Sequence, residues 1–225
     1  MQKLQKTPKK SFKYLIGIDE VGRGPVAGPV AVCTSIIRFD EVRKKTQRIK
    51  DLFRGRQESS SLPKLRDSKR LSEAGRESWF SHLVRNENKP VISFSLSYAS
   101  AKEIDKRGIA VCIKSLINRN LRKLHKEIKF SFDDVLVLLD GGLKAPDDFL
   151  YQETIVGGDD KEPIISFASI YAKVSRDRLM CRLGKKYPQY GLSKHKGYGT
   201  REHFDAIKSF GPIYIHRLTF IKSLL

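Results

Sequence analysis

The alternation of apolar and polar positions divides the chain into segments typical of strands. Short apolar runs cover residues 13–18 and 29–37, and the turn between them favours a hairpin. Residues 90–98 alternate polar and apolar side chains, as a strand with one buried face does. Further apolar runs at 134–139 and 154–156 predict two more strands.

Helical spacing of apolar residues fills the intervals between these strands. Ser72 is a suitable N-cap for a helix that continues to about residue 85. Residues 101–125 place an apolar stripe on one helical face, and residues 164–183 keep the same spacing. Because strands alternate with helices, the sequence predicts an α/β layered structure, with one domain over residues 13–225.

Three segments depart from this pattern and are strongly basic. Residues 1–12 form a lysine-rich arm that we expect to be flexible, because it has little apolar surface to bury. Residues 39–66 form a basic insertion that includes a serine-rich connector at 57–61, and it fits a nucleic-acid contact or a solvated helix equally well. From about residue 185, basic residues interleave with tyrosines, which suits backbone neutralisation with base stacking.

The charge balance restricts the partners of the protein. Its 225 residues contain 44 Lys and Arg against 25 Asp and Glu, which gives a formal net charge of +19. Such an excess favours a polyanion, most plausibly nucleic acid, although an anionic membrane or a ribosomal role also fits the charge alone. No apolar run approaches the roughly 20 residues that a membrane-spanning helix needs.

Cysteine usage and the N-terminus indicate a cytoplasmic location. Cys33, Cys112 and Cys181 are odd in number and widely spaced among apolar residues, so we expect reduced core thiols rather than disulfides or a zinc site. The first residues include lysines but no apolar signal core, which argues against secretion.

The first predicted strand ends on the residues with the clearest chemistry. Asp19 and Glu20 follow its apolar run and are suited to a hard divalent cation, although an acidic pair at a strand end also occurs in turns and helix caps. In the next residues, Gly22 and Gly24 leave the backbone open to a ligand and flank Arg23, which suits a phosphodiester. Together these features predict metal-assisted phosphodiester chemistry.

Two later strands also deliver acids at their ends. The run 134–139 leads directly into Asp140, and the run 154–156 is followed after two glycines by Asp159. A second and a third acid in this position favour a metal site over simple turn chemistry. Within the helix predicted at 164–183, Ser169, Lys173 and Asp177 have a spacing that places them on one face.

These motifs, in this order, resemble the ribonuclease HII family. The blocks that carry the resemblance are Asp19-Glu20-x-Gly-Arg-Gly, Asp67-Ser68-Lys69-x-Leu71-Ser72, Asp140-Gly141, Ala168-Ser169-Ile170-x-Ala172-Lys173-Val174-x-Arg176-Asp177, Lys196-Gly197-Tyr198-Gly199-Thr200 and His216-Arg217. The resemblance spans about residues 14–220, apart from the longer segment at 39–66. It implies a ribonuclease H-like α/β fold, with a mixed central sheet flanked by helices and a C-terminal helical part from about residue 185.

The resemblance also implies a catalytic centre of four carboxylates that hold two Mg²⁺ or Mn²⁺ ions. Its members are Asp19, Glu20, Asp140 and Asp159. The lysine that usually precedes the fourth acid is missing here, and Asp177 is the rival for that position, although pairing with Lys173 fits structural support better. Metal-activated water would then leave 5′-phosphate and 3′-hydroxyl ends, with no histidine base required.

The expected substrates are RNA/DNA hybrids and DNA duplexes with embedded ribonucleotides, cut on the 5′ side of the ribose. By resemblance, the backbone of Gly22, Arg23 and Gly24 senses the 2′-hydroxyl, and Tyr198 stacks on the neighbouring deoxyribose. The positions that resemble phosphate contacts of the family are Ser68, Lys69, Ser169 and Lys173.

Two alternatives stay open from the sequence. A ribonuclease HIII-like enzyme would carry Gly-Lys-Gly in place of residues 22–24 and an additional N-terminal domain. A basic nucleic-acid-binding protein without catalysis would lack one of the four acids, and all four are present. We expect a monomer that does not associate with membranes. The C-terminal residues contain no clear docking peptide for a sliding clamp.

Overall fold

The computed structural model of the protein describes residues 11–38, 56–57, 60–63, 65, 68, 70–85 and 91–224. The predictions for the N-terminal arm and for most of the basic insertion at 39–66 therefore fall outside the described residues. Within the insertion, the backbone of β3 (Arg56–Gln57) pairs antiparallel with β4 (Ser60–Ser61). The serine-rich segment is therefore not only a connector, because a gap of two residues lets the chain pair with itself.

The described residues form a mixed five-stranded sheet, as predicted, in the order β5-β2-β1-β6-β7. Its strands are β1 (Tyr14–Val21), β2 (Val30–Arg38), β5 (Ile92–Ala99), β6 (Val135–Asp140) and β7 (Gln152–Ile155). The hairpin prediction is also confirmed, since β1 and β2 are antiparallel, as are β2 and β5, whereas β1, β6 and β7 run parallel. The carboxyl ends of β1, β5, β6 and β7 consequently lie at one edge of the sheet.

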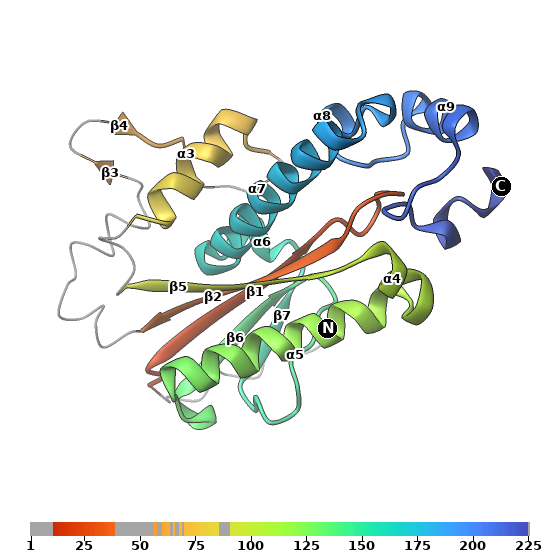
Figure 1. Cartoon of the computed structure of the whole chain (residues 1–225). Coiled ribbons are helices and arrows are strands. Elements are labelled where there is room, and N and C mark those ends of the chain that lie inside the picture. The colour runs from red at the N-terminus through yellow and green to blue at the C-terminus, as the bar shows by residue number, and fades with distance from the viewer. Residues whose placement is uncertain are drawn as a thin grey trace, which may run out of the picture.

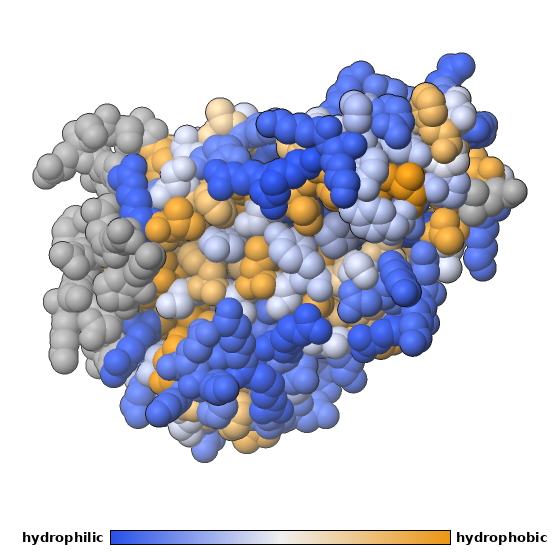
Figure 2. All heavy atoms as spheres, viewed as in Figure 1, coloured by the Kyte–Doolittle hydropathy of each residue, from blue (hydrophilic) through white to orange (hydrophobic). Residues whose placement is uncertain are grey.

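Helices cover both faces of this sheet (Figure 1). The helix α5 (Ile109–Ile128) packs on β2 and β5, whereas α7 (Pro163–Lys186) packs on β1 and β2 from the opposite side, with α3 (Glu73–Leu83) beside it. Separate apolar clusters fill the two layers, one under α5 and one under α7. In Figure 2, hydrophilic side chains gather over α7 and over α5, and less polar side chains occupy the band between these helices.

The segment 101–125, predicted as one helix, forms two. A capping box between Ser100 and Glu103 starts α4 (Ala101–Arg107), and α5 follows after Gly108. Gly108 has a φ of +78°, a value that favours glycine, and its N–H donates to the carbonyl of Ile104 at 2.8 Å. The apolar spacing continues across this break, which is why periodicity alone did not reveal it.

The helix α7 packs closely on β1, and this contact sets the position of the polar residues on α7 relative to the end of β1. A Cβ atom at Gly17 would overlap the backbone of Ile164, so only glycine permits this approach. On the neighbouring strand, the hydroxyl of Ser35 donates to the carbonyl of Ile164 at 2.7 Å. The first turn of α7 is thereby held directly against the middle of β1, two residues before Asp19.

The C-terminal part is helical, as predicted, and has its own apolar cluster around Met180, Tyr190 and Ile207. The remaining helices of the structure are short. They are α6 (Gly158–Lys161), α8 (Leu192–His195), α9 (Arg201–Phe210) and the 3-10 turns Phe132–Asp134, Pro188–Tyr190, Leu218–Phe220 and Lys222–Leu224. A backbone bridge between Ala27 and His216 ties this part to the chain that follows β1.

Two further expectations concern the state of the cysteines and the absence of a membrane-spanning helix. All three cysteines are free, and Cys33 and Cys112 are buried as predicted, but Cys181 is only half-buried because it lies on α7 beside the exposed Ser193. Across the described residues, no helix has both the length and the apolar character needed to cross a bilayer.

Buried histidines make the stability of the C-terminal part depend on pH. The Nε2 atoms of His203 and His216 are 3.2 Å apart, and burial lowers the pKa of His203 to about 4 and also lowers that of His216. The unfolded chain, with histidine pKa near 6.5, therefore binds more protons than the folded chain as the pH falls from about 6.5 to 4. We expect the melting temperature to fall across this window, measured by circular dichroism, and His203→Gln to flatten the profile. An equally steep profile in that variant would contradict this assignment.

Candidate active site

Two aspartates lie side by side where β1 and β6 end. In this parallel pair Ile18 is opposite Leu139, so Asp19 and Asp140 are the next residues on neighbouring strands. Side chains alternate between faces along a strand, and Ile18 and Leu139 belong to the cluster under α5. Both aspartates therefore face the other side, toward α7.

The remaining two acids approach from a loop and from the opposite face of β1. The N–H of Gly158 donates to Oδ1 of Asp140 at 2.7 Å, which places the start of α6 and Asp159 beside the strand ends. Glu20 points to the α5 side of the sheet, where Nη1 of Arg23 lies 3.0 Å from its Oε1. The structure thus brings together all four acids that the sequence singled out.

The electrostatics of this group are unfavourable without a cation. Asp19 is only 4% exposed, and its pKa is raised well above the ordinary value, first by burial and then by the charges of Glu20, Asp140 and Asp159. A hydrogen bond from Ser169 partly offsets this effect. Burial also raises the pKa of Glu20, although Arg23 opposes the increase. A group of carboxylates that repel one another in this way is stabilised by a positive ion.

The four carboxylates are suitable ligands for a hard divalent cation, but their side chains are not arranged around a common coordination site. Among the described residues, no group of three or more histidine, cysteine or acidic side chains is already arranged to hold an ion. The acids instead accept protein donors: Oδ1 of Asp19 takes the N–H of Glu20 at 2.7 Å, and Asp140 takes that of Gly158. Rotation of these two side chains would free their oxygens, and carboxylate oxygens are the ligands that Mg²⁺ and Mn²⁺ prefer.

The glycine loop that follows β1 is held by a buried arginine from the C-terminal part. The guanidinium of Arg217 donates to the carbonyls of Gly22 at 2.7 Å, Arg23 at 2.8 Å and Gly28 at 3.0 Å. Because a peptide unit is planar and trans, its N–H points away from its C=O. The N–H groups of Arg23 and Gly24 are therefore directed away from Arg217, which leaves two backbone donors side by side.

A second buried arginine supports the same loop from α7. Arg176 donates to the carbonyls of Ala27, Pro29 and Lys196, and its side chain lies where a Cβ atom at Gly22 would be. Neither Arg176 nor Arg217 is exposed to solvent. Both arginines lie within the motifs at residues 168–177 and 216–217, but the motif pattern alone assigns them no role. One feature of the sequence could have indicated a buried role for Arg176. It is a charged residue between Val174 and Met180, which are buried apolar residues of a core helix.

Tyr198 lies against this loop. The backbone N–H groups of Val26 and Ala27 donate to the carbonyl of Gly197 at 2.9 and 3.1 Å, which joins the two segments. A Cβ atom at Gly24 would lie 3.7 Å from Cε1 of Tyr198, which is ordinary van der Waals contact. Tyr198 is 44% exposed, so it borders the loop and is partly open to solvent.

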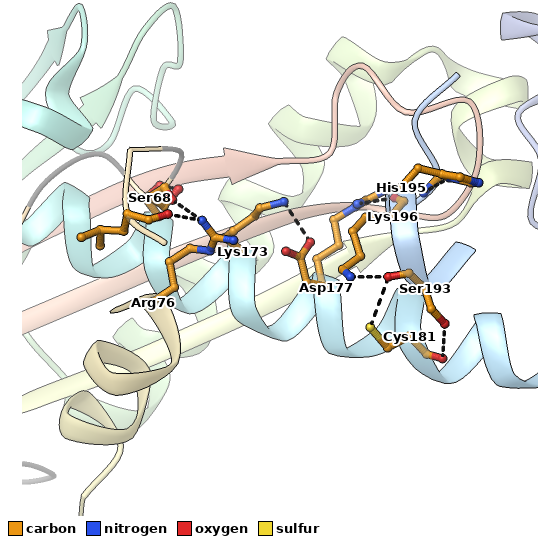
Figure 3. A network of polar contacts seen from close by, with 12 residues as sticks. Ser68, Arg76, Lys173, Asp177, Cys181, Ser193, His195 and Lys196 are labelled. Carbon is orange, nitrogen blue, oxygen red and sulfur yellow. Dashed lines mark hydrogen bonds and ion pairs between the residues drawn. The ribbon is translucent and has the colours of Figure 1, made fainter. Parts of the chain in front are cut away.

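Of the predicted phosphate contacts, Ser169 and Lys173 lie on α7, and Figure 3 shows Lys173 together with Ser68. The hydroxyls of Ser169 and Ser68 are 2.8 Å apart, and the carbonyl of Ser68 accepts a bond from Arg76 at 2.9 Å. Further along the helix, Nζ of Lys173 lies 3.0 Å from Oδ1 of Asp177, and both side chains are largely buried. Ser68 and Ser169 therefore adjoin Asp19, whereas Lys173 is engaged by Asp177. Lys69 lies outside the described residues.

A mixed sheet with four acids at one edge, beside a glycine loop with outward backbone N–H groups, is the arrangement expected of a metal-dependent nuclease. A sequence model of the family described as ribonuclease HII matches residues 16–223. The chain belongs to the ribonuclease HII family. It is accordingly a metal-dependent endoribonuclease that acts on RNA/DNA hybrids.

Individual relatives agree with this assignment. The ribonuclease HII of Caldanaerobacter subterraneus subsp. tengcongensis is 35% identical over 221 residues, which cover 98% of this chain and 79% of the relative. The crystal structure of ribonuclease H2 from Pyrococcus horikoshii OT3 shares the fold, with a TM-score of 0.66, 24% identity and coverage of 94% and 96% of the two chains. A crystal structure of Bst-RNase HIII in complex with Mn²⁺ also shares it, with a TM-score of 0.67, 17% identity and coverage of 96% and 70%.

Proposed function

We propose that the protein nicks duplex DNA on the 5′ side of an embedded ribonucleotide, in addition to cutting RNA/DNA hybrids. The observation that carries this proposal is the position of the four acids directly before the clamped loop at residues 22–24. A phosphodiester placed between them has carboxylates on one side and outward backbone donors on the other. Tyr198 borders the same loop and supplies a flat apolar face for the neighbouring sugar.

In this proposal Asp19, Glu20, Asp140 and Asp159 hold two Mg²⁺ or Mn²⁺ ions. Such ions supply an activated water and stabilise the leaving oxygen, which yields 5′-phosphate and 3′-hydroxyl ends. The Mn²⁺-bound relative supports the choice of ion. The hydroxyl of Ser169 orients Asp19, and the pair of Ser68 and Ser169 can accept or donate at the adjacent phosphate.

Recognition of the ribose falls to the backbone of Arg23 and Gly24. Their outward N–H groups can donate to a 2′-hydroxyl oxygen, which a deoxyribose lacks. The buried Arg217 holds these two peptide units by their carbonyls, and the buried Arg176 holds the loop further on, at the carbonyls of Ala27 and Pro29.

A duplex of DNA with one internal ribonucleotide tests the proposal. With Mg²⁺ or Mn²⁺ we expect a single nick 5′ to the ribose, mapped on a denaturing gel against a ladder. A matched duplex with deoxyribose at that position should stay intact. Cleavage confined to long RNA/DNA hybrids would contradict the proposed specificity, and binding without any nick would contradict catalysis.

Comparison of two aspartates identifies the fourth ligand. Asp159→Asn should lower the metal-dependent rate by on the order of a hundredfold or more, because it removes a charge from the acid cluster. Asp177→Asn breaks the pair with Lys173 instead, so its main effect should be a lower melting temperature with a smaller loss of rate. The reverse ranking of the two rates, measured at several Mn²⁺ concentrations, would assign the ligand to Asp177.

A further inference from the structure

A groove lies against the first half of α5. It consists of two adjoining hollows of about 260 and 440 Å³, which share Lys114, Lys144, Pro146 and Asp147 in their walls. The first hollow extends to Arg23 in the glycine loop, and the second extends to Arg107 at the end of α4. We call these two hollows together the α5 groove.

The groove begins at the same sheet edge as the catalytic carboxylates. Because β5 runs parallel to β1, it delivers α4 and the start of α5 to the edge where β1 and β6 end. The segment that carries Lys144 leaves β6 at that edge as well. Arg23 borders the groove on one side and pairs with Glu20 on the other, so the groove is continuous with the site.

Positive charge dominates the walls of the groove. Its cations are Arg23, Arg107, Lys114 and Lys144, and Asp147 is its one acid among the described residues. Lys144 lies 2.8 Å from Asp147, and both side chains are well exposed. The pKa of Asp147 is held below its ordinary value, chiefly by Lys144 and further by Lys114, which shows that these cations act on one region of space.

We propose that the α5 groove binds the phosphodiester backbone of the nucleic-acid substrate, on the opposite side of the scissile phosphate from Tyr198. Three observations favour this occupant. Lys114 and Lys144 lie where the two hollows adjoin, and Arg23 and Arg107 extend the positive charge into one hollow each, which suits a chain of phosphates better than a single small anion. The channel starts at the acid cluster, and Tyr198 borders the glycine loop from the α7 side of the sheet. A duplex that crosses the sheet edge would therefore contact both.

The groove inference rests on the proposed function, and it makes a quantitative prediction about salt. Each phosphate contact that a cation makes contributes about 0.9 to the slope of log K against log salt concentration. Replacing Lys114 and Lys144 together with glutamine should therefore lower that slope by about 1.8 and weaken binding on the order of tenfold at 0.1 M salt. Binding is measured by fluorescence anisotropy with a labelled duplex containing one ribonucleotide, in EDTA so that no cleavage occurs.

A matched control is available on the same helix. Lys123→Gln together with Lys126→Gln removes the same charge from exposed positions further along α5, outside both hollows. This control should change the slope by much less than the groove variant does. Equal slopes and affinities for the two double variants would overturn the inference.

Asp147 provides a test of opposite sign. Asp147→Asn removes the negative charge from the groove wall, so it should tighten duplex binding and steepen the salt dependence, whereas a general loss of structure would weaken binding. Weaker or unchanged binding would contradict the proposal and would leave an acidic protein segment as the better candidate for the groove. If the unaltered protein fails to nick the ribonucleotide duplex, the proposed function fails, independently of these binding results.

Discussion

Replacing Asp140 with asparagine is expected to lower the rate of cleavage by on the order of a thousandfold or more, equivalent to about 4 kcal/mol of transition-state stabilisation. The amide oxygen can still accept the N–H of Gly158, so the local backbone is retained. The negative charge of Asp140 beside Asp19 and Glu20 is lost, and with it one of the four proposed ligands of the divalent ions. The rate is measured under single-turnover conditions with a ribonucleotide-containing duplex.

The same substitution should raise the melting temperature in the absence of divalent ions, since it removes repulsion from a buried acid group. Asp160→Asn is the matched control, because Asp160 adjoins the site but pairs with Arg70 at the surface. Its cleavage rate should stay within a few-fold of the unaltered protein, as expected for an exposed pair. Normal turnover in Asp140→Asn would exclude the role of Asp140 as a metal ligand.

The second large effect is expected from Gly22→Ala. Gly22 has a φ of +91°, and an added Cβ would collide with the side chain of Arg176. The strain costs about 1–3 kcal/mol, and a shift of the loop by about 1 Å costs on the order of a hundredfold in rate. We expect kcat/KM on the ribonucleotide duplex to fall by about that factor while circular dichroism shows a folded protein.

Gly24→Ala separates crowding from a general effect of glycine replacement. Its added Cβ would make ordinary contact with Tyr198, and Gly24 does not have a positive φ. A loss of less than about tenfold is therefore expected. If the two variants lose activity equally, the contact with Arg176 is not what constrains the loop.

The sheet and the acid cluster could be predicted from local pattern. Asp19 and Asp140 each end an apolar run, and parallel strands bring such ends to one edge, so their meeting follows from the sequence once the strands are paired. The two-helix arrangement of residues 101–128 could not be predicted, because the apolar stripe continues past Gly108. The helix α6 was also missed, since its four residues are too short to show a period.

The features that could not be predicted from the sequence depend on contacts between residues far apart in the chain. The bonds from Arg176 to Pro29 and from Arg217 to Gly22 join residues 147 and 195 positions apart, and no local pattern records such a separation. The α5 groove is of the same kind, because Arg23, Lys114 and Lys144 come from three distant segments.

The separation between Gly22 and Arg217 also sets an order of events during synthesis. The glycine loop leaves the ribosome early, and the arginine that holds it follows 195 residues later. At about 5–20 residues per second, that interval lasts roughly 10–40 seconds. Throughout it the loop carbonyls lack their guanidinium partner, so a nascent chain can bring its acids together before the glycine loop is held in place.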